Sequence, residues 1–125
     1  MPLATTITRH DPRRATVTVS GSLDTATAPE LDAALRPLLE GADLRLVIFD
    51  LARLEFLSSA GIRVILAARK SLKAKEGIFA MRNLQPQIQK VFEVVQALPG
   101  FAIFQSEAEM DAYLAQIQKK VVEGK

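Results

Sequence analysis

The chain of 125 residues is long enough for one domain, since domains commonly contain about 100–200 residues, and we expect that domain to span residues 1–125. Hydrophobic residues make up 49% and charged residues 24%, a globular composition, while the lack of cysteine excludes disulfides, thiolate metal sites and cysteine nucleophiles. The net charge is only +2 and aromatic residues are 6%, which provides neither the basic surface nor the stacking platform of a nucleic-acid-binding protein.

The sequence also predicts where the protein resides. No apolar run approaches the roughly 20 residues that span a bilayer. The N-terminal residues lack the apolar core of a signal peptide. We therefore expect a cytoplasmic protein without a membrane span.

The first half of the chain predicts a hairpin, a helix and a buried strand. Residues 3–9 and 15–20 alternate apolar and polar side chains around a polar turn at 10–14, which is typical of a β-hairpin. Thr25 or Thr27 can cap a helix that ends near Gly41, and Pro37 predicts a break or a kink in its last turn. Residues 44–51 hold a continuous apolar run, the pattern of a strand covered on both faces, which ends near Asp50.

The second half continues this alternation. Helical periodicity is present at 61–74, 86–97 and from Ser106 onward, where Glu109 completes a capping-box pattern. Short apolar segments at 78–81 and 101–104 predict strands. The order β-β-α-β-α-β-α-β-α predicts an α/β fold with a mixed, mostly parallel sheet of about five strands and about four helices.

Residues that could catalyse a reaction do not converge. The glycines are never closer than sixteen residues, so the chain has neither a P-loop nor a dinucleotide fingerprint. His10 lies in the polar turn, and we interpret it as an exposed loop residue rather than as the base of a triad with Ser58 or Ser59. We expect no enzyme activity, no metal site and no cofactor.

Carboxylates follow two of the expected strands. Asp24 and Asp50 would lie at strand ends, where ligands of α/β sheets usually bind. An equally acceptable interpretation is that Asp24 accepts hydrogen bonds from backbone N–H groups in the turn before a helix. Both interpretations remain open from the residues alone.

The segment 54–62 joins the most apolar strand to the second long helix and places two serines at the start of that helix. One serine is expected to cap the helix, a contribution of about 1 kcal/mol. The other is not needed for capping. Because free N–H groups and the helix dipole favour anions at this position, its hydroxyl is a suitable place for a phosphate.

Two motifs here resemble a known family. The pattern Asp50-Leu51-x-x-Leu54-x-Phe56-Leu57-Ser58-Ser59-Ala60-Gly61-Ile62 is similar to the signature of STAS domains, the anti-sigma factor antagonists of bacteria. Upstream, Gly21-Ser22-Leu23-Asp24 and the following residues 25–31 resemble the Gly-x-Leu-Asp turn and first helix of that family. The length and the order of elements agree as well.

The resemblance implies a regulatory protein that binds an anti-sigma factor, usually an ATP-dependent serine kinase, and thereby frees a sigma factor. The kinase would phosphorylate the serine two residues before the glycine, which is Ser59, with Ser58 as the second choice, and a phosphatase would restore binding. The residue before the acceptor is commonly Asp in the family and is Ser58 here. The implied partner-binding residues are Asp24, Thr25, Phe56, Leu57, Ser58, Ala60, Gly61, Ile62 and Arg63.

The alternative is a STAS-like interaction subunit of a transport or stress-signalling complex that no kinase modifies. Ser58 and Ser59 would then serve only the helix start, while the same surface binds a partner. Incubation with candidate kinases and ATP, followed by intact mass measurement, separates the two hypotheses.

Overall fold

The expected hairpin opens the computed structural model, which describes residues 2–97 and 104–124. Strand β1 (Ala4–Asp11) pairs antiparallel with β2 (Arg14–Leu23). Both strands are longer than predicted, because the turn narrows to residues 12–13 and the Asp11 carboxylate accepts the Arg13 N–H at 2.8 Å. His10 therefore lies in β1, so its predicted place in a loop is wrong, although its side chain is exposed as expected.

The rest of the sheet is parallel. Strand β3 (Leu46–Leu57) pairs with β2, and β4 (Ile78–Arg82) pairs with β3, which gives the order β1-β2-β3-β4. The α/β fold and the mixed sheet are thus confirmed, with four strands in the described part of the chain. The fifth expected strand, 101–104, lies largely outside the described residues, and Phe104 is in a bend.

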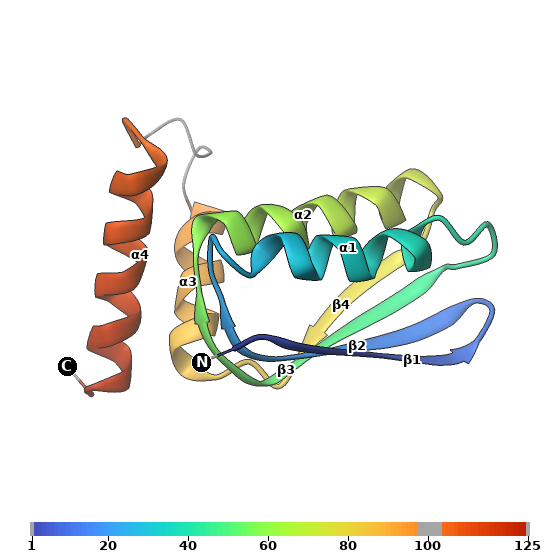
Figure 1. Ribbon diagram of the computed structural model, residues 1–125, viewed down its shortest axis with the longest axis horizontal. Helices are drawn as coiled ribbons and strands as arrows, with labels where there is room; N and C mark the ends of the chain where they lie inside the picture. The colour runs from blue at the N-terminus through green and yellow to red at the C-terminus, as the bar shows by residue number, and fades with distance from the viewer. Residues whose placement is uncertain (1, 98–103, 125) are drawn as a thin grey trace.

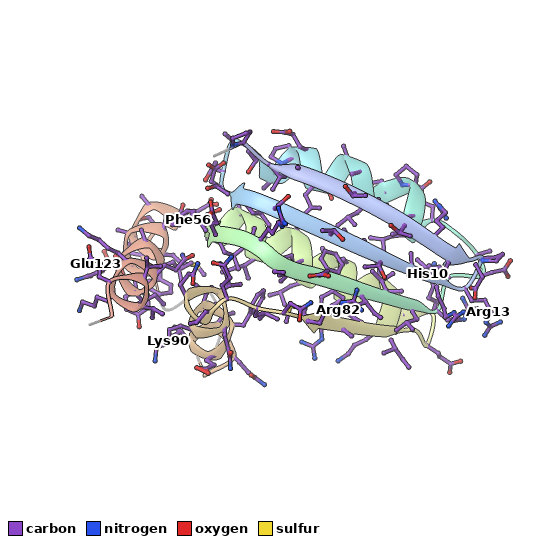
Figure 2. All side chains as sticks on the ribbon, turned by 90° about the horizontal axis from the view of Figure 1, so that it is seen from below. His10, Arg13, Phe56, Arg82, Lys90 and Glu123 are labelled. Carbon is purple, nitrogen blue, oxygen red and sulfur yellow. The ribbon has the colours of Figure 1, made fainter. Side chains whose placement is uncertain are left out.

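Four helices complete the described structure: α1 (Ala28–Leu39), α2 (Ser59–Ala74), α3 (Pro86–Ala97) and α4 (Glu107–Val122). Helices α1 and α2 cover one face of the sheet, while α3 and α4 stand side by side beyond its end (Figure 1). Figure 2 looks onto the opposite face, over which no described helix passes. None of these four helices combines the length and the apolarity needed to cross a membrane.

The core lies between the sheet and helices α1 and α2. It is formed by alternate residues of β2 and β3 and by the inner stripes of the two helices, all fully or nearly fully buried. Each large aliphatic side chain buried in this way contributes about 1.5–3 kcal/mol. The start of α2 is therefore held on a well-packed base, whose central side chains include Val17, Val19, Leu23, Leu31, Leu35, Val47, Phe49, Leu51, Ile62 and Ile65.

Two boundaries differ from the expectation for physical reasons. A break or a kink was predicted at Pro37, and the break is absent: helix α1 continues through Pro37 to Leu39, although the proline has no N–H to donate to the carbonyl four residues earlier. Strand β3 continues past Asp50, which is mid-strand and not at a strand end as predicted. Irregular pairing with β2 leaves Ala52 and Arg53 both exposed, and this bulge interrupts the alternation by which a strand is recognised.

Candidate functional site

The loops that follow β2 and β3 meet at one edge of the sheet. The Ser58 N–H donates to the Leu23 carbonyl at 2.9 Å, which ties the start of α2 to the end of β2. Gly61 makes this approach possible: a Cβ at that position would lie 2.6 Å from Leu23 Cγ and 3.0 Å from the Leu23 carbonyl oxygen. The two motifs of the sequence are therefore neighbours in space.

Asp24 holds the turn between β2 and α1. Its Oδ1 accepts the N–H groups of Ala26 and Thr27, both at 3.0 Å. Thr27 is the N-cap residue, but its hydroxyl donates to the Ser22 carbonyl at 2.9 Å instead of capping the helix. The interpretation of Asp24 as a backbone acceptor is confirmed, and Thr25 is exposed beside it.

Ser58 caps helix α2. Its Oγ accepts the Gly61 N–H at 3.3 Å, and the residue is 4% exposed. The prediction that one of the two serines fills the capping position is confirmed. The helix begins at Ser59, two residues before the predicted start at Gly61.

Ser59 is completely buried beneath helix α4. Its Oγ lies 2.7 Å from Asp111 Oδ1, and its backbone N–H donates to the same carboxylate oxygen at 2.9 Å. Glu107 Oε1 lies 3.4 Å from the hydroxyl. Hydrogen bonds to a charged group contribute about 1.5–3 kcal/mol, so the surplus serine is bound firmly within the chain.

Two further contacts hold α4 in this place. The Gln118 amide, 3% exposed, accepts the Leu57 N–H at 2.9 Å and donates to the Leu57 carbonyl at 2.8 Å. Arg63 pairs with Glu107 at 2.8 Å, but both side chains are more than 40% exposed, so this ion pair contributes only about 0–1 kcal/mol. Sequence reasoning missed these α4 residues; their only signal was the acidic i, i+4 pair of Glu107 and Asp111.

The remaining predicted partner-binding residues divide by exposure. Arg63 is exposed, and Phe56 and Ala60 are half-buried. Figure 2 shows Phe56 at the tip of β3 beside α4. The side chains or backbone of Leu57, Ser58, Gly61 and Ile62 are buried and shape the surface from below.

Other polar groups lie away from this edge. His10 is at the opposite end of the sheet from Phe56 (Figure 2), and its Nε2 lies 2.8 Å from Thr16 Oγ1. Asp50 accepts the Ala52 N–H at 3.2 Å, and this bond, with smaller contributions from Asn83 and Arg82, holds the pKa of the Asp50 carboxyl below its ordinary 3.8. Within residues 2–97 and 104–124, no three His, Asp or Glu side chains are grouped as metal ligands would be.

The chain is similar in sequence to a known protein family. The family model described as STAS domain matches residues 5–110. BtrV of Bordetella bronchiseptica, a candidate anti-sigma factor antagonist, is 34% identical over 88 residues, which cover 70% of this chain and 75% of BtrV. The anti-sigma-B factor antagonist of Bacillus subtilis is 32% identical over 79 residues, which cover 62% of this chain and 70% of that protein.

Solved structures show the same fold. The anti-sigma factor antagonist SpoIIAA in its unphosphorylated form superimposes with a TM-score of 0.62 at 22% identity, covering 72% of this chain and 82% of SpoIIAA. The phosphorylated form of SpoIIAA, from Bacillus, gives 0.61 at 22% identity, with 73% and 82% covered. SpoIIAA is thus a protein of this fold known in two phosphorylation states.

Proposed function

The chain belongs to the STAS domain family, and from this premise we propose that it is an anti-sigma factor antagonist, a protein that binds an anti-sigma factor and so frees a sigma factor. It acts by binding and not by catalysis. The proposal is supported by two relatives that are more than 30% identical and are named as antagonists or as a candidate antagonist. It is supported equally by the shared edge at which the Asp24 turn meets the start of α2.

The observation that carries the proposed switch is the second serine at the start of α2. Ser58 already caps the helix, so the Ser59 hydroxyl is free of that task. An ATP-dependent serine kinase would transfer the γ-phosphoryl group to Ser59 Oγ, with ADP leaving, and a phosphatase would hydrolyse the ester. Such a kinase uses ATP, which fits a cytoplasmic site of action.

Phosphorylation would change the charge of the surface without disturbing the packed core beneath it. A phosphoserine carries about −1.5 to −2 charges, which brings the formal net charge of +2 close to zero. The first N–H groups of α2 favour an anion, while a partner that packs against the uncharged serine would meet repulsion and a desolvation cost. The modification would therefore block binding while the fold persists.

The surface offered to the partner combines exposed and half-buried residues around this serine. Thr25 and Arg63 are exposed, and Asp24, Phe56 and Ala60 are half-buried. We assign direct contacts to these five residues and a shaping role to Leu57, Ser58, Gly61 and Ile62 beneath them.

One observation favours a second candidate function. Ser59 is fully buried and Ser58 is 4% exposed, so neither hydroxyl is accessible to a kinase in this arrangement. An interaction subunit of a transport or stress-signalling complex would keep both serines permanently in these structural roles.

Phosphorylation by the serine-kinase anti-sigma factors of the host genome separates the two functions. Each purified kinase is incubated with ATP and the wild type, Ser59→Ala, Ser58→Ala or Ser71→Ala, and the intact mass is measured. Ser71 is exposed on the same helix and serves as the matched control. We expect one added phosphoryl group in every protein except Ser59→Ala; loss only in Ser58→Ala assigns the second choice. A kinase that binds the wild type but leaves its mass unchanged contradicts the switch and favours the interaction subunit.

A further inference from the structure

Helix α4 lies across the surface that the proposed partner and kinase would need. Figure 1 places α4 beyond the end of the sheet where β3 turns into α2, next to α3. Its polar side chains bind three successive parts of that turn: Gln118 binds the Leu57 backbone, Asp111 binds Ser59, and Glu107 binds Arg63. The helix is thus attached to the candidate site itself and not merely near it.

The chemistry of the contact makes it sensitive to charge. Asp111 accepts both the hydroxyl and the backbone N–H of Ser59, so a carboxylate already occupies the anion-favouring start of α2. A second carboxylate, that of Glu107, lies 3.4 Å from the same hydroxyl. A negative charge on the Ser59 side chain would replace the hydrogen bond of its hydroxyl to Asp111 by repulsion from both carboxylates at contact distance.

From these contacts we propose that α4 is an internal competitor for the Ser59 surface. It docks only while Ser59 is uncharged, it must leave before a partner or a kinase reaches the serine, and a negative charge on Ser59 prevents it from returning. Only the identity of that partner and kinase rests on the proposed function; the docking of α4 does not.

The departure of α4 would expose several groups of the candidate site at once. When α4 leaves, the Ser59 hydroxyl and the Leu57 backbone groups become accessible together, because α4 residues cover both. Arg63 lies four residues after Ser59 on the same helix, within reach of a group attached to Ser59. A phosphate there could pair with the guanidinium that Glu107 holds in the docked state.

Hydrogen exchange of the isolated protein, read by mass spectrometry, tests the proposal without any partner. In Ser59→Asp we expect amides of residues 107–122 to exchange about ten- to a hundredfold faster. This factor corresponds to the loss of one hydrogen bond to a charged group. Ser71→Asp adds the same charge to an exposed position of α2 and should leave α4 exchange unchanged. Peptides from α1 and β3 report whether each variant remains folded.

A second variant keeps the test decisive if Ser59→Asp does not fold. The double substitution Glu107→Ala, Asp111→Ala leaves Ser59 intact, removes both side-chain acceptors of its hydroxyl and should likewise accelerate exchange of residues 107–122. Wild-type exchange of α4 in a folded Ser59→Asp protein, or in the double variant, overturns the proposal.

The affinity of a partner protein for the double variant is an independent test of the proposal. Once an anti-sigma factor that binds the wild type is known, the double variant should bind it several-fold more tightly, because no internal helix competes. Equal affinity overturns the competitor role. Failure to find any binding anti-sigma factor would count against the proposed function and leave the exchange result standing.

Discussion

Replacing Gly61 by alanine should destabilise the protein, although the same change raises helix stability almost everywhere else. Gly61 is the third residue of α2 and packs against the end of β2. An added methyl group would lie 2.6 Å from Leu23 Cγ, 2.9 Å from its Cδ2 and 3.0 Å from its carbonyl oxygen. Leu23 is fully buried, and its carbonyl also accepts the Ser58 N–H at 2.9 Å, so neither side can yield easily.

The magnitude follows from two opposing terms. Forcing a methyl group into a packed contact costs about 1–3 kcal/mol, and the higher part of this range applies because backbone is involved. Alanine gains about 1 kcal/mol over glycine from helix propensity. We expect a net loss of about 1–2 kcal/mol in the free energy of unfolding, which is roughly 3–6 °C in Tm for a domain of this size.

Thermal unfolding followed by circular dichroism measures this change. Ser71→Ala is the matched control, because Ser71 is exposed on α2 and the substitution should stabilise the helix by about 0.5 kcal/mol. The sign is decisive: a Gly61→Ala protein that is more stable than the wild type refutes the close packing of α2 on β2.

Three other predictions follow from individual contacts. Gln118→Ala removes the side chain that binds the Leu57 N–H and carbonyl and should weaken α4 docking by about 1–3 kcal/mol, seen as faster exchange confined to α4; slowed or unchanged exchange would contradict it. Asp24→Ala should cost about 1 kcal/mol in thermal unfolding, whereas Asp24→Asn retains the acceptor and should cost less; equal losses would refute the role of Asp24 as an acceptor of backbone N–H groups. Because the pKa of Asp50 is lower in the folded state, the ionised carboxylate stabilises the fold above about pH 3.8. This stabilisation is lost as the pH falls through the lower folded-state pKa. Urea unfolding from pH 5 to about 2 should therefore show a shallower loss of stability in Asp50→Asn, and parallel curves would contradict this.

Local patterns predicted the elements whose signals lie within a few residues. Helix α3 has the predicted bounds, Pro86–Ala97, because a proline begins its first turn and an apolar stripe continues to its end. The hairpin and the capping serine at 106 were equally local. The long β3 was not predictable, because its bulge depends on pairing with β2 and breaks the alternation.

The candidate site was predictable only in part. The positions of Ser58 and Ser59 at the helix start follow from a short motif, as does the Asp24 turn. The cover by α4 depends on a contact between residues 52 positions apart, which no periodicity in either helix specifies. Gln118 gave no signal either, since a glutamine in a helix usually faces water. It is buried here because its amide forms hydrogen bonds with the N–H and the carbonyl of Leu57.

The affinity of an anti-sigma factor for two forms of the protein, one with serine and one with phosphoserine incorporated at position 59, tests the central claim most directly. The account predicts specific binding by the serine form, and binding at least about a hundredfold weaker by the phosphoserine form, because a charge-changing modification at an interface introduces repulsion and desolvation. The circular dichroism spectra of the two forms should both show a native fold. Equal affinity of two folded forms would contradict the claim that Ser59 is the switch.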